Sequence, residues 1–247
     1  MAMPDVKLRP SDRRFGARTL LLAVAVVLVA VPFLLLLLLV ESHSTALREV
    51  DNGARDTLHG YALDNAAFVR FLQFVSFLGS TPFWLVVFVP IALWLLWRRL
   101  PRLAAFVAIT VTLSSLLNNV VKTLVHRARP VLPDPVAHAG GQSFPSGHAQ
   151  AAVVGYGVLV LVFLPVLRGA WRRIAVGVAV VMVLAIGFAR VGLGVHYFSD
   201  VLAGYILGGA WLVAMTALFS AWKVERGRPA VRPSEGLEPE QADRLAP

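Results

Sequence analysis

The run LLLAVAVVLVAVPFLLLLLLV, residues 20–40, decides the fold class. It holds 21 residues without a charged side chain, which is about the length that an α-helix needs to cross the hydrocarbon core of a bilayer. Five basic residues precede it: Lys7, Arg9, Arg13, Arg14 and Arg18. Glu41 follows with no small-residue cleavage site, so the run predicts a retained transmembrane helix and not a signal peptide.

The composition of the whole chain agrees with a membrane protein. Of its 247 residues, 57% are hydrophobic and 15% are charged, and the mean hydropathy is +0.72. A soluble domain has about 25% charged residues, so this chain could not cover a soluble surface. The absence of cysteine excludes disulfides, thiolate metal sites and a cysteine nucleophile.

Further apolar stretches follow the first run, at residues 83–97, 103–121, 148–166, 174–188 and 201–222. The 83–97 stretch is short for a span, so we expect its helix to begin earlier or to extend beyond the hydrocarbon. The pattern predicts an all-α polytopic membrane protein with six transmembrane helices in a bundle.

We expect three parts along the chain. A basic cytoplasmic arm covers residues 1–19, and a membrane domain covers residues 20–222, within which residues 41–80 form an extracytoplasmic or interfacial segment. The tail, residues 223–247, is rich in Pro, Glu and Arg with little apolar content, so disorder is expected there.

The basic residues predict the orientation. The net charge of +9 and the isoelectric point near 11.0 would also suit nucleic-acid binding, but the Lys and Arg residues occur in short groups between apolar runs. With both termini on one side, that side collects 16 of the 23 Lys and Arg residues. Positive residues favour the cytoplasm, so both termini are predicted inside, and no nucleic-acid partner is expected.

Two polar loops, residues 122–147 and 190–200, are then predicted outside. In the first, Lys122 and Arg129 could converge on one dianion, the lysine as a point charge and the arginine as a planar fork. The alternative is that Lys122 extends toward lipid headgroups and Arg129 anchors the chain at the interface.

The same loop ends in Pro145-Ser146-Gly147-His148, directly before an apolar stretch. Ser146 suits a helix N-cap, and Gly147 lets the backbone approach a ligand. The free N–H groups of the first turn would then form an anion site beside His148. A capped helix start with an interfacial histidine is the alternative.

The second loop holds Arg190, His196 and Asp200. With His196 in the turn before the next helix, Asp200 is within reach of its ring. A carboxylate that accepts the N–H of one imidazole nitrogen leaves the other nitrogen free as a base or nucleophile. Alternatively, Asp200 balances the helix dipole and His196 is an interfacial side chain.

Because all three groups fall on one predicted face, they favour a site for a phosphate monoester or a similar oxyanion. Together the motifs Lys122-x6-Arg129-Pro130, Pro145-Ser146-Gly147-His148 and Arg190-x5-His196-x3-Asp200 resemble the three-part signature of the type 2 phosphatidic acid phosphatase superfamily. That superfamily includes vanadium haloperoxidases and glucose-6-phosphatase-like enzymes. One departure is Ala189, where the family usually has Ser.

The resemblance implies a role for each motif residue. His196 would attack phosphorus and form a phosphohistidine, Asp200 would orient it, and His148 would protonate the departing oxygen and then activate water. The phosphate oxygens would be held by Lys122, Arg129, Arg190, Ser146 and the Gly147 amide. No carboxylate cluster suggests a metal, so no cofactor is expected, and vanadate should act as a phosphate mimic.

The function expected from the resemblance is hydrolysis of a lipid phosphate. The count of basic residues places the site on the outer face, and a short six-span chain suits a bacterial plasma membrane. Candidate substrates are phosphatidic acid, phosphatidylglycerophosphate and a polyprenyl pyrophosphate. Alternatives are a lipid phosphotransferase of the same superfamily, a haloperoxidase-like enzyme, and an anion transporter or non-catalytic binder.

Overall fold

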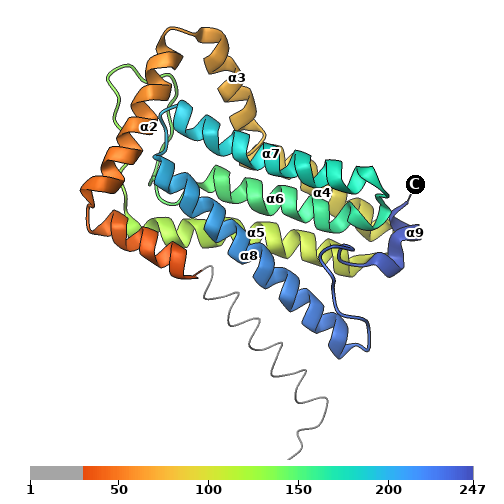
Figure 1. Cartoon of the computed structure of the whole chain (residues 1–247). Helices are drawn as coiled ribbons and strands as arrows, with labels where there is room; N and C mark the ends of the chain where they lie inside the picture. Colours follow the sequence, from red (N-terminus) through yellow and green to blue (C-terminus); the bar gives the residue numbers. More distant parts are fainter. Residues whose placement is uncertain (1–29, 247) are drawn as a thin grey trace, which may run out of the picture.

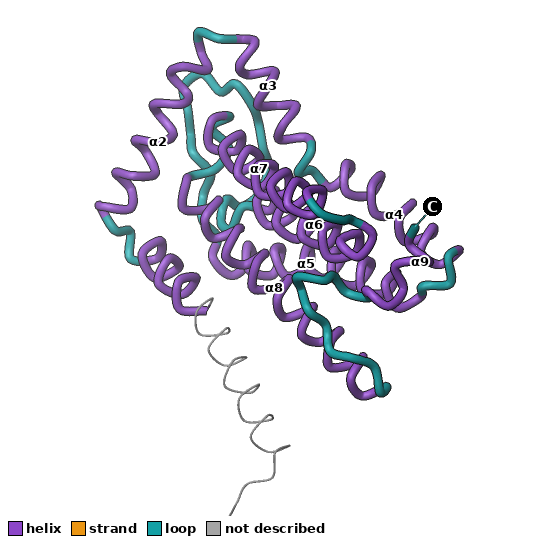
Figure 2. Tube along the Cα trace, turned by 45° about the vertical axis from the view of Figure 1, so that its right-hand side comes forward, coloured by secondary structure: helices purple, strands orange, loops and turns teal. Residues whose placement is uncertain are grey.

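The computed structural model describes residues 30–246, and over these residues the chain is helical apart from its loops and one isolated bridge (Figures 1 and 2). The arm predicted at residues 1–19 and the start of the first apolar run lie outside the described residues. After a helical segment, Ala30–Glu41, the main helices are α2 (Thr45–Leu63), α3 (Ala66–Phe77), α4 (Thr81–Trp97), α5 (Pro101–Val125), α6 (Gly147–Phe163), α7 (Ala170–Gly192) and α8 (Phe198–Glu225).

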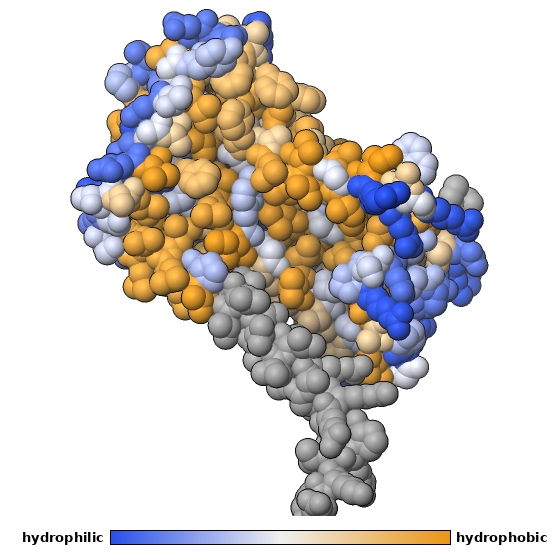
Figure 3. Space-filling view, viewed as in Figure 1, coloured by the Kyte–Doolittle hydropathy of each residue, from blue (hydrophilic) through white to orange (hydrophobic). Residues whose placement is uncertain are grey.

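Helix α6 lies at the centre of the bundle, in contact with α5, α7 and α8 (Figure 1). Half of its apolar window is buried, against about a third or less for the other spans. The outer helices turn apolar side chains outward, and Figure 3 shows these as a hydrophobic belt between two hydrophilic ends. A belt of this kind matches the hydrocarbon core of a membrane.

Five helices of the described chain are long and apolar enough to span a bilayer, and a sixth span results if Ala30–Glu41 and α2, bent by 91°, count as one. The all-helical, multi-span prediction is therefore confirmed. The second span begins earlier than residue 83, because α3 and α4 together form a candidate span of 32 residues, Ala66–Trp97. At their junction, a Cβ on Gly79 would lie 2.7 Å from a side-chain atom of Ile186, so the glycine lets the chain pack against α7.

The tail differs from the disorder expected of it. After α8 it folds back across the bundle end and adds two short helices, η2 (Pro239–Gln241) and α9 (Ala242–Leu245). Leu237 is fully buried, and its N–H donates to the carbonyl of Leu161 at 3.0 Å. The apolar residues of this segment are few, but they pack on the bundle, and average composition does not reveal that.

The alternation of helix directions determines where the functional motifs meet. Helices α5 and α7 end at the same end of the bundle from which α6 and α8 begin, and α2 lies across that end (Figure 1). The last turns of two helices and the first turns of two others therefore converge there.

Candidate active site

All eight residues predicted for the site lie at this convergent end. Lys122 is in the last turn of α5 and Arg190 in the last turn of α7. Ser146 is the N-cap of α6, and Asp200 lies in the first turn of α8. The remaining four are Arg129 in the loop after α5, Gly147 and His148 at the start of α6, and His196 in the turn before α8.

His196 is 1% exposed and has a defined orientation. Its Nε2 lies 3.1 Å from Nη1 of Arg129. A guanidinium can only donate, so Nε2 is the acceptor, and the proton of the neutral ring is on Nδ1. Nδ1 lies 3.4 Å from Oδ2 of Asp200, so the carboxylate faces the protonated nitrogen while the lone pair of Nε2 faces the cations.

Asp200 is 0% exposed, and both of its oxygens are hydrogen-bonded. Oδ2 accepts from the hydroxyl of Ser143 at 2.5 Å and from the N–H of Tyr197 at 2.9 Å. Oδ1 accepts from Nη1 of Arg127 at 2.6 Å. These contacts stabilise an ionised carboxylate beside His196.

Burial lowers the pKa of His196 to about 4, although Asp200 opposes the shift; Arg190 and Arg129 add to it. The imidazole is therefore neutral at physiological pH. A neutral imidazole is the form that can act as a nucleophile.

Three cations lie at this end of the bundle, Arg129 in contact with the ring, and each is held by a neutral partner. Lys122 donates to the carbonyl of Gln142 at 2.5 Å, and Arg129 donates to the carbonyls of Gly140, Gly141 and Val195. Arg190 donates to the hydroxyl of Ser76 at 2.7 Å. None of these partners is a carboxylate, so the positive charge of the cations is available to an anion.

His148 lies at the same end of the bundle, as the second residue of α6 directly after Gly147. The start of α6 beside it is held in place by Ser146, whose hydroxyl caps the helix and whose N–H donates to the carbonyl of Asp200 at 2.9 Å. A Cβ on Gly204 of α8 would lie 2.6 Å from the Ser146 carbonyl oxygen. This glycine therefore allows the two helix starts to approach closely.

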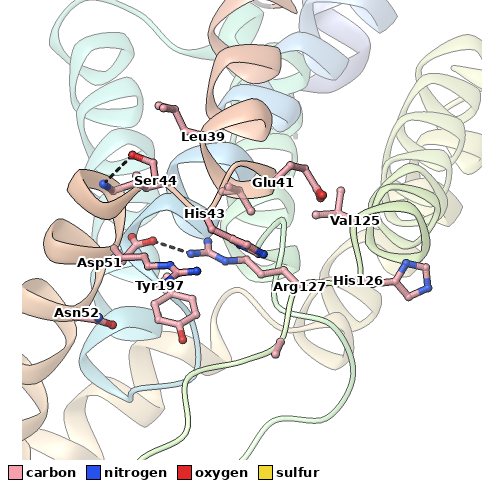
Figure 4. Close-up of a pocket in the computed structure, with 14 residues that line it drawn as sticks. Leu39, Glu41, His43, Ser44, Asp51, Asn52, Val125, His126, Arg127 and Tyr197 are labelled. Atoms are coloured by element: carbon pink, nitrogen blue, oxygen red, sulfur yellow. Dashed lines mark hydrogen bonds and ion pairs between the residues drawn. The ribbon is translucent and has the colours of Figure 1, made fainter.

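Sequence reasoning missed a charged clamp that binds α2 to the site. Arg127 donates Nη2 to Oδ2 of Asp51 at 2.8 Å while its Nη1 donates to Asp200. Asp51 also accepts from the hydroxyl and the N–H of Ser199 at 2.6 and 2.8 Å. Figure 4 shows Arg127 reaching Asp51 beside the ring of Tyr197, over which the guanidinium lies at 4.3 Å from the centroid.

The two carboxylates of the clamp stabilise the positive charge of Arg127. Burial disfavours the charge of Arg127, but Asp200 and Asp51 outweigh it and raise the pKa of the guanidinium. The position of Arg127 inside the first motif is a signal that could have found it. No local pattern pairs it with Asp51, which lies 76 residues earlier in the chain.

Other polar residues that the sequence analysis did not single out form hydrogen bonds to the site residues or between the helices that carry them. Ser143 bonds Asp200, and Ser76 bonds Arg190. Deeper in the bundle, Asn118 donates to Gln150 at 2.7 Å, and Gln150 donates to Ser114 at 2.9 Å. This buried chain joins α5 to α6 directly beneath Gly147, at which a Cβ would lie 3.1 Å from the Asn118 side chain.

A cavity of about 410 Å³ lies at the bend between Ala30–Glu41 and α2. Its lining includes Leu39, His43, Arg48 and Arg127 (Figure 4). None of the eight predicted site residues lines it, but two of its lining residues, Arg127 and Tyr197, are hydrogen-bonded to Asp200.

The arrangement supplies the groups that phosphoryl transfer requires. Nε2 of a neutral imidazole faces Arg129, and a carboxylate faces its other nitrogen. Two further cations and a second histidine lie at the same end of the bundle. Cations held around a bound phosphoryl group stabilise the charge on its oxygens in the transition state.

Known proteins with similar sequences act on phosphorylated lipids. Phosphatidylglycerophosphatase B of Bacillus subtilis is 33% identical over 137 residues, which are 54% of this chain and 66% of that protein. The lipid A 1-phosphatase of Rhizobium etli is 34% identical over 128 residues, 48% of this chain and 51% of that protein. The match thus spans between half and two thirds of the length of these relatives.

A solved structure extends the similarity to the fold. The transmembrane PAP2 type phosphatidylglycerolphosphate phosphatase from Bacillus subtilis superimposes with a TM-score of 0.70 at 25% identity, over 82% of this chain and 98% of that one. The sequence profile of the PAP2 superfamily matches residues 102–223, which include all three motifs. With the motif residues gathered at one end of the same helical framework, the chain belongs to the PAP2 superfamily.

Proposed function

We propose that this protein is a lipid phosphate phosphatase that works through a phosphohistidine at His196. The observation that carries the proposal is the geometry of that ring: Nε2 faces Arg129 at 3.1 Å and Nδ1 faces Asp200. A structural histidine would not need its lone pair aimed into a group of cations.

In the first step, Nε2 of His196 attacks phosphorus and the bond from phosphorus to the lipid oxygen breaks. The negative charge of the bound phosphate favours the protonated form of His148, which gives its proton to that oxygen, so the alcohol leaves neutral. In the second step, His148 takes a proton from water, whose oxygen attacks the phosphohistidine, and Nε2 leaves. Asp200 stabilises the ring while it carries positive charge.

In this scheme Arg129 has one hydrogen-bond partner without substrate and another when the phosphate is bound. Without substrate, its Nη1 bonds the lone pair of the nucleophile. A phosphate group entering between Lys122, Arg129 and Arg190 is a better acceptor for a guanidinium than an imidazole is. Its arrival therefore transfers Arg129 to a phosphate oxygen and frees Nε2 to attack.

Arg127 and Asp51 serve as positioning residues. Arg127 holds the oxygen of Asp200 that does not face His196, and Asp51 fixes both Arg127 and the first turn of α8 through Ser199. The carboxylate that orients the nucleophile thereby depends on α2.

The substrate class follows from the membrane setting and from the relatives. The candidates are phosphatidic acid, phosphatidylglycerophosphate and a polyprenyl pyrophosphate. We place the site on the extracytoplasmic face of a bacterial plasma membrane and both termini inside, because 16 of the 23 basic residues then face the cytoplasm. Lys122, Arg129 and Arg190 take the charge-stabilising role, so the reaction is proposed to need no metal.

The test is phosphate release by the purified protein in detergent from a panel of these lipids, with and without a chelator. We expect release that the chelator does not diminish and that vanadate inhibits. The variant His196→Gln should be inactive, while His138→Gln, which changes an exposed histidine of the loop after α5, should be as active as the wild type. Full release by His196→Gln would contradict the mechanism, and phosphate found on an added acceptor lipid would show a phosphotransferase.

Orientation has a separate test. A reporter fused after Trp222 should report a cytoplasmic location, and one inserted within residues 131–144 should report an external one. The reverse pattern would overturn the proposed side of the site.

A further inference from the structure

The end of the bundle opposite the active site carries a second, strongly basic cavity. The tail that folds back over this end forms part of it, together with the start of α5 and the end of α8. Its volume is about 490 Å³. Since α8 is 28 residues long, the two ends of the bundle are about 40 Å apart.

Five arginines line this cavity: Arg99, Arg102, Arg226, Arg228 and Arg244. Among the described lining residues, Glu238 is the one carboxylate, and burial raises its pKa. Arg228 lies 3.6 Å from it, and no other of the five has a carboxylate within 4 Å in the described part of the chain. The lining therefore has a large positive charge that residues 30–246 do not neutralise.

Two of these arginines are held in place by an aromatic side chain. Arg102 and Arg226 both lie over the ring of Trp222, with their guanidinium carbons 5.2 and 5.3 Å from its centroid. Stacking on an aromatic face fixes a guanidinium and leaves its N–H edges free to bond an anion. Nη1 of Arg102 is buried without a hydrogen-bond partner in the described chain.

The start of α5 adds to the attraction for an anion. Leu100, Pro101 and Arg102 all line the cavity, and α5 begins there without a side-chain cap. The first N–H groups of a helix and its dipole attract negative charge, and they act here together with the five arginines.

We propose that this cavity binds the phosphate groups of an anionic ligand, and that an anionic phospholipid of the adjacent leaflet is its source. Arginine forks match phosphate oxygens, and the volume has room for more than one phosphate. The surroundings favour a lipid because Trp97, Leu96 and Leu218 present exposed apolar surface at this end. Basic pockets beside membrane helices are suited to lipid headgroups that carry more than one charge.

Binding to the purified protein in detergent tests the proposal, by native mass spectrometry with cardiolipin, phosphatidylcholine and soluble pyrophosphate as separate probes. We expect one cardiolipin to bind with at least tenfold higher affinity than phosphatidylcholine. The double variant Arg99→Gln/Arg226→Gln should lose at least tenfold of that affinity. Both side chains are exposed, so the variant should remain folded.

The matched control is Arg168→Gln/Arg173→Gln, which removes the same charge from exposed positions at the same end, outside the cavity. Its affinity for cardiolipin should stay within about twofold of the wild type. An equal loss in both double variants would show diffuse attraction and overturn the proposal.

The pyrophosphate arm separates the two sources. Sensitivity of pyrophosphate binding alone to Arg99→Gln/Arg226→Gln would support the site and identify a soluble phosphate compound as its ligand. No sensitivity with either probe would overturn the proposal. Phosphatase turnover should be unchanged in both double variants, and its absence in the wild type would bear on the proposed function and not on this cavity.

Discussion

The two ends of the helical bundle both gather arginines, but they treat the charge in opposite ways. At the active-site end, Arg127 is bonded to two carboxylates, and Arg129 and Arg190 are bonded to carbonyl and hydroxyl oxygens. At the tail end, two of the five guanidiniums, those of Arg102 and Arg226, lie over the ring of Trp222, and Arg228 is the one with a carboxylate within 4 Å in the described part of the chain. Arginines of the first kind are held in fixed positions, as catalysis requires, whereas those of the second kind offer their hydrogen bonds to a ligand.

This difference between the two ends shows that the basic residues of the chain do not all have the same role. The effect of a Lys or Arg residue on membrane orientation depends on the side of the membrane on which it lies and little on its exact position in a loop. What sets Arg127 apart is a buried acid, Asp51, that is 1% exposed. The local partner therefore decides whether a basic residue fixes topology, positions a catalytic group or recruits an anion.

The largest difference between the two ends should appear when one carboxylate is neutralised at each of them. Asp200→Asn should lower kcat by about a thousand- to ten-thousand-fold, because the amide can present its N–H to the ring and favour the wrong tautomer. Asp243→Asn, an exposed acid of the tail end, should leave kcat unchanged. Steady-state phosphate release measures both. Equal activity of Asp200→Asn and the wild type would remove Asp200 from the mechanism.

The clamp should show the next largest effect. Arg127→Gln should lower kcat by about ten- to a hundred-fold with little change in KM, because Asp200 loses the partner of one oxygen while the phosphate-binding cations remain. It should also lower the free energy of unfolding by about 3 kcal/mol, since Asp51 is left as a buried, unpaired charge.

A double variant separates these two effects. Asp51→Asn/Arg127→Gln should regain part of the lost stability in thermal unfolding, because the unpaired charge is gone, but none of the lost kcat. Recovery of kcat together with stability would show that the clamp only stabilises the fold.

The pKa of His196 provides a smaller and more specific contrast with ordinary histidines. Its imidazole should stay neutral as the pH falls through 6.5 and should become protonated near pH 4, because burial disfavours the charged ring. Imidazole ¹⁵N chemical shifts of the labelled, unliganded protein measure this, and His196→Gln identifies the signal. A midpoint near 6.5 would mean that the ring is solvated, and it would contradict a buried, neutral His196.

At the other end, Leu237→Ala should affect stability but not catalysis. The side chain is fully buried against the bundle, so its truncation should cost about 2–4 kcal/mol, visible as a lower midpoint of thermal unfolding. Because the active site lies about 40 Å away along α8, kcat should stay within about twofold. A large loss of kcat would mean that the two ends are coupled.

The sequence predicted the parts of this fold that depend on local pattern. Apolar runs located the helices of the bundle, and their alternating directions brought Lys122, Ser146, Arg190 and Asp200 to one end. Helix starts such as that of α6 were readable because Ser146 has the chemistry of an N-cap.

What escaped prediction depends on contacts between distant segments. Nothing near Asp51 in the sequence shows that it meets Arg127. Ser44 caps the start of α2, but a cap does not show that the chain turns there by 91° from Ala30–Glu41. The tail was assigned to disorder because its average composition is polar, yet single residues such as Leu237 and Lys223 are buried in contact with the bundle and with each other. Composition averages over such contacts, whereas packing depends on each of them.

Trapping the covalent intermediate tests the central claim most directly. The purified protein is mixed with a ³²P-labelled lipid phosphate, quenched in alkali within one turnover, and digested for peptide mapping. The account predicts an alkali-stable, acid-labile label on the peptide that contains His196, present in the wild type and absent in His196→Gln. Label on a different residue, or full turnover with no labelled protein at any time, would contradict it.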